Sequence, residues 1–169
     1  MSLSDELFKV IVVGDACVGK TSFITRYVEG CFRMVEYKPT IGVDFALKIL
    51  PWSSTEFVRV QLWDIAGQDR FAWITRVYYK DSQGCAIMFD LSSRTSFLSV
   101  PKWKRDVDEK CRLDDGSPIP CVLLANKCDI PRTKRQVRQS EIECMQRDEG
   151  FIGWTEVSAK DGIMVMESM

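Results

Sequence analysis

Histidine does not occur in this sequence of 169 residues. Its absence excludes Ser-His-Asp and Cys-His catalytic sites, and also every zinc site that needs an imidazole ligand. The seven cysteines include no Cys-x-x-Cys pair, so they offer neither a zinc ribbon nor a thioredoxin-like redox site. We interpret them as the reduced thiols of a cytosolic protein. Any chemistry must therefore rest on backbone N–H groups, on Lys, Thr, Asp and Gln side chains, or on a metal that they hold.

Neither sign of charge dominates the sequence, and long apolar runs are missing. The 23 basic and 24 acidic residues leave a net charge of −1, so the overall charge does not attract nucleic acid. Runs of about 18 apolar residues, which a membrane-spanning helix requires, do not occur. With 46% hydrophobic and 28% charged residues, the composition is that of a globular protein. The length and the lack of repeats or linkers predict a single domain over residues 1–169.

Short apolar runs alternate with longer amphipathic stretches along the chain. The two runs separated by residues 53–55 should pair as an antiparallel hairpin. Alternating strands and helices are typical of a mostly parallel sheet, so we expect an α/β fold with six strands, one antiparallel edge strand and helices on both faces. The expected strands are 7–13, 43–52, 56–65, 85–91, 121–125 and 154–157. The expected helices are 21–28, 95–112, 136–149 and one that begins near Gly162. Residues 70–80 should be mixed helical or irregular. Pro101 predicts a kink or a late start in the helix over 95–112.

Residues 14–21, Gly-Asp-Ala-Cys-Val-Gly-Lys-Thr, match the phosphate-binding pattern G-x-x-x-x-G-K-[ST] in full. The glycines allow the backbone to fold around a phosphate, so that successive N–H groups and the positive end of the helix dipole point at the anion. Lys20 supplies a positive charge to the outer phosphates, and the Thr21 hydroxyl can bind Mg²⁺. The loop predicts a nucleoside triphosphate site with the members Ala16, Cys17, Val18, Gly19, Lys20, Thr21 and Ser22.

Two later segments select the base. Asn-Lys-Cys-Asp at residues 126–129 follows an apolar strand, and the carboxylate of Asp129 can accept hydrogen bonds from guanine N1–H and N2–H₂. Adenine cannot donate that pair of hydrogen bonds, and a site with an unmatched acceptor rejects it. Ser-Ala-Lys at residues 158–160 follows the last strand and can meet the guanine carbonyl oxygen and the face of the base. The expected base-binding residues are Asn126, Lys127, Asp129, Ser158, Ala159 and Lys160.

Residues near the end of the hairpin point to the reaction. Asp64 can hold a water bound to Mg²⁺, and Gly67 can turn its N–H toward a γ-phosphate. Gln68 can orient the attacking water and is the expected catalytic residue. Thr40 can reach the metal while the γ-phosphate is present and release it after hydrolysis, which is an order–disorder switch. The expected metal ligands are therefore Thr21, Thr40 and Asp64.

Together these segments resemble the Ras-like small GTPases, and within them the Rab family. The resemblance runs from about Phe8 to the end of the chain, and its Rab-like marks are residues 41–45, 61–64, 70–71 with 74–75, and 78–79. It implies the P-loop NTPase class and the small G-protein fold. It also implies nucleotide contacts from Phe32, which should stack on guanine, and from Tyr37. Phe45, Trp63 and Tyr78 match the aromatic triad of Rab proteins, so the expected effector surface comprises Ile41, Val43, Phe45, Trp63, Phe71 and Tyr78.

The resemblance also implies cofactors and partners. These are Mg²⁺ with GTP or GDP, a guanine nucleotide exchange factor, a GTPase-activating protein, a GDP-dissociation inhibitor or escort protein, and effectors of the GTP form. Rab proteins reach membranes through a lipidated tail, but no cysteine follows Cys144 here, and roughly two turns of the last helix are expected. We therefore expect these residues to be cytosolic, and the full-length protein to lie on the cytoplasmic face of endosomal, lysosome-related or vesicle membranes.

Finer marks suggest a subgroup. Ile65 replaces the Thr that most Rab proteins have before the Ala-Gly pair, and residues 43–48, 116–120, 123–129 and 150–154 resemble the Rabs of lysosome-related organelles. The implied function is a GTP/GDP switch that recruits effectors in vesicle and lysosome-related-organelle traffic.

Ala16 departs from the pattern, because Ras-like proteins have Gly at this position and many Rabs have Ser. A small side chain near the catalytic Gln predicts slow but not abolished hydrolysis. Ala16 also supports one alternative, a GTP-bound scaffold with very low hydrolysis. A P-loop kinase is the other alternative, but the chain has no Arg-rich lid and residues 126–129 would be unexplained. A second departure is one residue more than expected between Phe32 and Tyr37.

Overall fold

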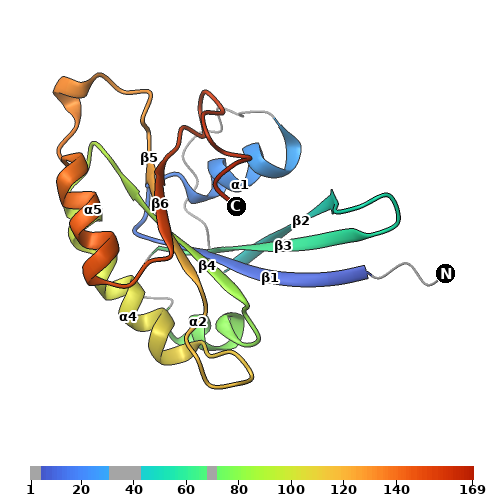
Figure 1. The fold of residues 1–169 in the computed structure, drawn as a ribbon. Coiled ribbons are helices and arrows are strands. Elements are labelled where there is room, and N and C mark those ends of the chain that lie inside the picture. Colours follow the sequence, from blue (N-terminus) through green and yellow to red (C-terminus); the bar gives the residue numbers. More distant parts are fainter. Residues whose placement is uncertain (1–4, 31–42, 68–71) are drawn as a thin grey trace.

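A six-stranded sheet forms the centre of the computed structural model, which describes residues 5–30, 43–67 and 72–169 (Figure 1). The strand order is β2-β3-β1-β4-β5-β6. β2 runs antiparallel to β3, and every other neighbouring pair is parallel. The expected mostly parallel sheet with one antiparallel edge strand is therefore confirmed. The strands are β1 (Asp5–Val13), β2 (Val43–Pro51), β3 (Phe57–Ile65), β4 (Gly84–Asp90), β5 (Cys121–Asn126) and β6 (Gly153–Glu156).

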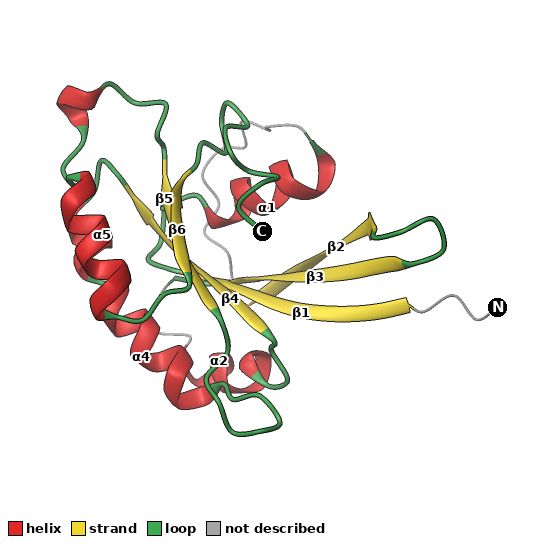
Figure 2. Cartoon of the chain, in the orientation of Figure 1, coloured by secondary structure: helices red, strands yellow, loops and turns green. Residues whose placement is uncertain are grey.

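Helices cover both faces of the sheet (Figures 1 and 2). Along β1, Ile11 and Val13 face one side while Val12 faces the other, because successive side chains of a strand alternate. Helix α1 packs on the Val12 side, and the remaining α-helices contribute to the core on the opposite side. These helices are α1 (Lys20–Glu29), α2 (Ala72–Tyr79), α3 (Arg94–Leu98), α4 (Val100–Lys110) and α5 (Gln139–Asp148), and a short 3₁₀ turn, η2, spans Arg132–Lys134.

The central strands are apolar on both faces because helices cover both. β4 has buried residues from Cys85 to Asp90, and β5 is almost as fully buried. Their parallel direction brings the carboxyl ends of β1, β4 and β5 to the same edge of the sheet. Ligands of open α/β sheets bind at this edge.

The predicted helix over 95–112 is two helices. The Ser93 hydroxyl accepts the N–H of Ser96 and caps α3, and Ser99 then separates α3 from α4. Pro101 lies in the first turn of α4, where a missing N–H costs no intrahelical hydrogen bond. The expectation of a late helix start at this proline is confirmed.

The prediction of a helix that begins near Gly162 is wrong. From Asp161 to Ser168 the described chain forms turns, and Ser158 pairs with Ile163 in an isolated bridge. Gly162 has φ 74° and Met164 has φ 53°, both left-handed values that a right-handed helix cannot contain. None of the helices in the described part of the chain has the length and apolar character that crossing a bilayer requires.

Candidate nucleotide site

The loop between β1 and α1 is folded too tightly for side chains at its two glycines. Gly14 has φ 148°, and a Cβ added there would lie 2.2 Å from the carbonyl oxygen of Met88. Gly19 has φ 98°, and its Cβ would lie 2.3 Å from the side-chain nitrogen of Asn126. Cys17, between them, has a left-handed φ of 67°. Residues of positive φ that alternate with residues of negative φ are the backbone pattern with which successive N–H groups form an anion site.

Lys20 folds back over this loop. Its ammonium donates to the carbonyl oxygens of Gly14 at 2.9 Å and of Asp15 at 2.7 Å, and the residue is 6% exposed. Burial lowers the pKa of Lys20 to about 8, and the carboxylates of Asp64 and Asp15 offset part of this shift. A bound phosphate would replace the missing hydration and stabilise the ammonium.

The end of β3 meets the loop. The hydroxyl of Thr21 donates a hydrogen bond to the carboxylate of Asp64, which is 4% exposed. A Cβ on Gly67 would lie 2.4 Å from the backbone nitrogen of Ala16 and 2.5 Å from the carbonyl oxygen of Gly14. The backbone after β3 therefore lies directly against the phosphate loop.

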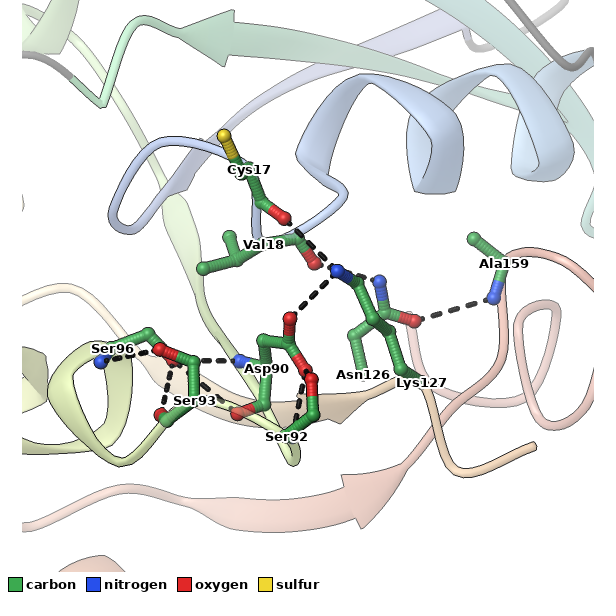
Figure 3. A network of polar contacts seen from close by, with 9 residues as sticks. All are labelled: Cys17, Val18, Asp90, Ser92, Ser93, Ser96, Asn126, Lys127 and Ala159. Carbon is green, nitrogen blue, oxygen red and sulfur yellow. Dashed lines mark hydrogen bonds and ion pairs between the residues drawn. The ribbon is translucent and has the colours of Figure 1, made fainter. Parts of the chain in front are cut away.

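Asn126 connects the phosphate loop to the segment after β6 (Figure 3). Its side-chain nitrogen donates to the carbonyl oxygen of Val18 at 2.8 Å, and its side-chain oxygen accepts the N–H of Ala159 at 3.3 Å. Asn126 is 2% exposed, so both halves of its amide are used inside the protein. Its placement fixes the distance between the phosphate loop and the base-binding segments.

Asp129 and Ser158, two of the expected base-binding residues, contact each other. The Ser158 hydroxyl donates to the Asp129 carboxylate at 2.7 Å and accepts the N–H of Asp161 at 3.0 Å. Ser158 is fully buried, which leaves it one orientation. The hydroxyl thus orients the carboxylate that the sequence assigns to guanine recognition.

Lys127 joins this site to the end of β4 (Figure 3). Its ammonium contacts the Asp90 carboxylate at 2.6 Å and donates to the carbonyl oxygen of Cys17 at 3.2 Å. The Lys127 backbone is left-handed, with φ 67°. Lys160, the remaining base-binding candidate, is exposed and follows Ala159 in the same turn.

The comparisons with known proteins agree with this geometry. The sequence profile of the Ras family matches residues 9–169. Human Rab-7L1 is 51% identical over 169 residues, which is 100% of this chain and 82% of that protein. Human Rab-32 is 52% identical over 164 residues, which is 97% of this chain and 72% of that protein. Rab-32A of Dictyostelium discoideum is 48% identical over 163 residues, which is 96% of this chain and 74% of that protein.

The chain belongs to the Ras family. The identities place it among the Rab proteins, and the small G-protein fold expected from the sequence is confirmed. A Rab-like small GTPase binds guanine nucleotide and hydrolyses GTP, and it works with regulators and effectors in membrane traffic.

Three aromatic residues of this Rab protein, Phe45, Trp63 and Tyr78, form a cluster in which Phe45 stacks on Trp63 and Tyr78 is tilted against it. Trp63 lies between Phe45 and Tyr78, with ring centroids 5.2 Å and 5.6 Å apart. The ammonium of Lys9 lies 4.5 Å from the Trp63 centroid, in cation–π geometry. Phe45 is 56% exposed although it is a large apolar side chain. The structure therefore brings together the three aromatic residues that the Rab resemblance singles out.

Several predicted residues lie outside the described part of the chain: Phe32, Tyr37, Thr40, Ile41, Gln68 and Phe71. Val43 is described only as the start of β2, where its backbone pairs with Ile65.

Two contributors to the site were not predicted. Asp90 ends an apolar strand at the carboxyl edge of the sheet, a position that could have drawn attention to it. Trp103 occupies an apolar position of α4, so the sequence predicts only a core residue, yet its indole N–H reaches the phosphate loop.

Proposed function

We propose that residues 1–169 form one GTP-binding domain that switches between GTP and GDP in vesicle and lysosome-related-organelle traffic. The observation that carries the proposal is the meeting of three distant segments at one edge of the sheet. The phosphate loop contacts Gly67 after β3, and Asn126 links that loop to Ala159. The phosphate loop suits the phosphates of a guanine nucleotide, and the segment at the end of β3 suits the γ-phosphate and its metal ion. The segments that contain Asn126 and Ala159 suit the base. The names of Rab-7L1 and Rab-32 support the assignment to Rab traffic.

The residues present fit Mg²⁺. The Thr21 hydroxyl and the Asp64 carboxylate are already in contact, and both offer the oxygen ligands that this hard cation prefers. We assign Thr21 and Asp64 to the metal, with Thr40 as the further expected ligand. When bound, Mg²⁺ neutralises charge on the phosphates and so favours their transfer.

The chain's own groups supply the remaining chemistry. Lys20, the loop N–H groups and the first turn of α1 hold the phosphates by charge and dipole. Gly67 directs its N–H toward the outer phosphate, and Gln68 orients the attacking water. Such phosphoryl transfer depends on positioning and electrostatics, which explains how a chain without histidine can perform it. No arginine is assigned to the transition state, so fast turnover should require an activating protein.

β3 connects the nucleotide to the effector surface. Trp63 and Asp64 are consecutive, so their side chains point to opposite faces of the sheet. Asp64 contacts Thr21 in the phosphate site, whereas Trp63 lies between Phe45 and Tyr78. A change at the γ-phosphate can thus alter the surface that effectors contact. We propose that the GTP form binds effectors there, with an exchange factor, an activating protein and a GDP-dissociation inhibitor or escort protein as regulators.

Base discrimination tests the nucleotide assignment. A fluorescent GDP bound to the protein should be displaced by GTP and GDP but not by equal concentrations of ATP. Asp129→Asn should lose this preference, because an amide cannot accept two hydrogen bonds from guanine in the same way. Asp161→Asn, two residues beyond the Ser158–Ala159 pair, is the matched control. Displacement by ATP as effective as by GTP would contradict the proposal.

Hydrolysis tests the switch against the scaffold alternative, which rests on Ala16. Single-turnover GTP hydrolysis should be measurable in the native protein and absent in Gln68→Leu, while Gln139→Leu on the surface of α5 should hydrolyse normally. Addition of an activating protein should allow multiple turnovers. A native rate no faster than that of Gln68→Leu, unchanged by the activating protein, would favour the scaffold.

The trafficking role is tested by comparing partners of the two nucleotide states. GTP-locked and GDP-loaded protein should capture different proteins from cells. The protein is proposed to act on the cytoplasmic face of endosomal, lysosome-related or vesicle membranes, which imaging can test. Identical partners for the two states would contradict a switch.

A further inference from the structure

Asp90 is a buried carboxylate whose two oxygens contact different parts of the molecule. It is 6% exposed at the end of β4, where an uncompensated charge would be costly. Oδ1 accepts the N–H of Ser92 at 2.8 Å and its hydroxyl at 2.6 Å. Oδ2 lies 2.6 Å from the ammonium of Lys127 (Figure 3). Oδ1 therefore stabilises the turn after β4, and Oδ2 contacts the base-binding segment.

The backbone around Asp90 is fixed independently of any ligand. The Ser96 hydroxyl donates to the carbonyl oxygen of Ser93 at 2.8 Å and accepts the N–H of Asp90 at 3.0 Å. Asp90 also pairs with Asn126 in the β4–β5 register, and the N–H of Leu91 donates to the carbonyl oxygen of Asn126. Asp90 is thus held beside Asn126, the residue that precedes Lys127.

Lys127 is constrained at both ends. Its backbone has the left-handed φ of 67°, which is uncommon for a residue with a side chain and persists only where surrounding contacts hold it. Its ammonium bridges the Asp90 carboxylate and the carbonyl oxygen of Cys17 in the phosphate loop. The apolar stem between these ends is held in place beside the base-binding residues.

We propose that Asp90 is a positioning residue for the nucleotide. By holding the Lys127 ammonium against the phosphate loop, it keeps the Lys127 stem in place as a wall of the base site and slows nucleotide release. This inference rests on the proposed guanine nucleotide function and adds a residue that acts only through Lys127. A purely structural role in the turn would need only the two hydrogen bonds from Ser92.

Nucleotide release separates these two roles. Asp90→Asn keeps an oxygen that can accept both Ser92 hydrogen bonds, but it loses the charge that holds Lys127. It should release fluorescent GDP about tenfold to a hundredfold faster than the native protein. The matched control is Asp108→Asn, which breaks an ion pair of the same length, 2.6 Å, with the buried Lys104 within α4, where neither residue belongs to the site. The control should release GDP at the native rate.

A double-mutant cycle tests whether Asp90 acts through Lys127. Lys127→Met keeps an unbranched apolar stem and removes the ammonium, so it should also release GDP faster. Because both substitutions remove the same contact, the double variant should release GDP no faster than the faster single variant. Effects that multiply would overturn the inference, since Asp90 would then act independently of Lys127.

The remaining outcomes are also decisive. If the native protein retains GDP and Asp90→Asn releases it at the native rate, the inference is overturned while the proposed function stands. If the native protein retains no guanine nucleotide, both are overturned. If Asp90→Asn does not fold, Lys127→Met decides, because release at the native rate would show that the held ammonium does not retain the nucleotide.

Discussion

The indole N–H of Trp103 donates a 2.8 Å hydrogen bond to the carboxylate of Asp15, 88 positions earlier in the chain. Trp103 belongs to α4, whereas Asp15 belongs to the phosphate loop. The same loop is held at Cys17 by Lys127 and at Val18 by Asn126. Three residues from two other segments of the chain, α4 and residues 126–127, therefore fix the phosphate loop.

Trp103→Phe should loosen this loop. Phenylalanine keeps an aromatic ring in the core but has no N–H, so Asp15 loses its donor. We expect the free energy of unfolding to fall by about 1–3 kcal/mol, and GDP release to become faster. Urea denaturation and release of fluorescent GDP measure the two effects. Asp15→Asn, which keeps an acceptor oxygen, should stay close to the native protein, and native behaviour of Trp103→Phe would contradict the prediction.

Gly67→Ala should slow GTP hydrolysis while leaving GDP binding nearly unchanged. The new Cβ would lie 2.4 Å from the backbone nitrogen of Ala16, so the segment after β3 must move away from the phosphate loop. Its N–H then no longer reaches the γ-phosphate, while the sites for the base and inner phosphates remain. We expect GTP hydrolysis to fall about a hundredfold, with GDP affinity nearly unchanged.

Single-turnover hydrolysis and GDP titration measure these quantities. Gly153→Ala is the matched control, because a Cβ there meets nothing within 4 Å and the residue has no positive φ. A Gly67→Ala protein that hydrolyses GTP at the native rate would show that this close approach does not serve the reaction.

The sequence is sufficient to predict the sheet and the phosphate loop because both depend on local patterns. Apolar runs such as β4 indicate buried parallel strands, and the pattern of residues 14–21 predicts the backbone conformation of a phosphate loop. The bonds of Trp103 and Asp90 could not be predicted in this way. Each joins residues that only the tertiary structure brings together, and each side chain also has a common local explanation, as a core aromatic and as a turn residue.

The helix predicted near Gly162 is a case in which the local sequence pattern gave the wrong structure. Its local pattern favoured a helix, but the Ser158–Ile163 bridge directs the backbone into turns, and Met164 adopts a left-handed φ despite its side chain. A local bridge between residues five positions apart therefore takes the place of the predicted helix.

Phe45→Ala should weaken effector binding without destabilising the fold. The side chain is 56% exposed and stacks on Trp63 from the outside, so its removal opens no internal cavity. We expect the free energy of unfolding to change by less than about 1 kcal/mol, while the affinity of GTP-bound protein for an effector should fall at least about tenfold.

The measurement is a titration of an effector captured by the GTP-locked protein. Trp52→Ala is the matched control, because Trp52 is 76% exposed in the turn between β2 and β3 and lies beyond the cluster. Equal losses for the two variants would contradict a specific role for the Phe45–Trp63–Tyr78 cluster.

Nucleotide binding should take up a proton above pH 8 because of Lys20. In the free protein burial lowers the pKa of Lys20 to about 8, whereas bound phosphates stabilise the ammonium and raise this pKa. At about pH 8.5 many free molecules carry neutral Lys20 and bound molecules carry the ammonium, so binding takes up a fraction of a proton. At about pH 6 both states are charged and no uptake from Lys20 is expected. The apparent affinity should therefore fall as pH rises through 8.

Calorimetric titrations in buffers with different ionisation heats measure the uptake. Lys20→Arg, whose guanidinium stays charged, should abolish it, and equal uptake in the two proteins would show that another group takes up the proton.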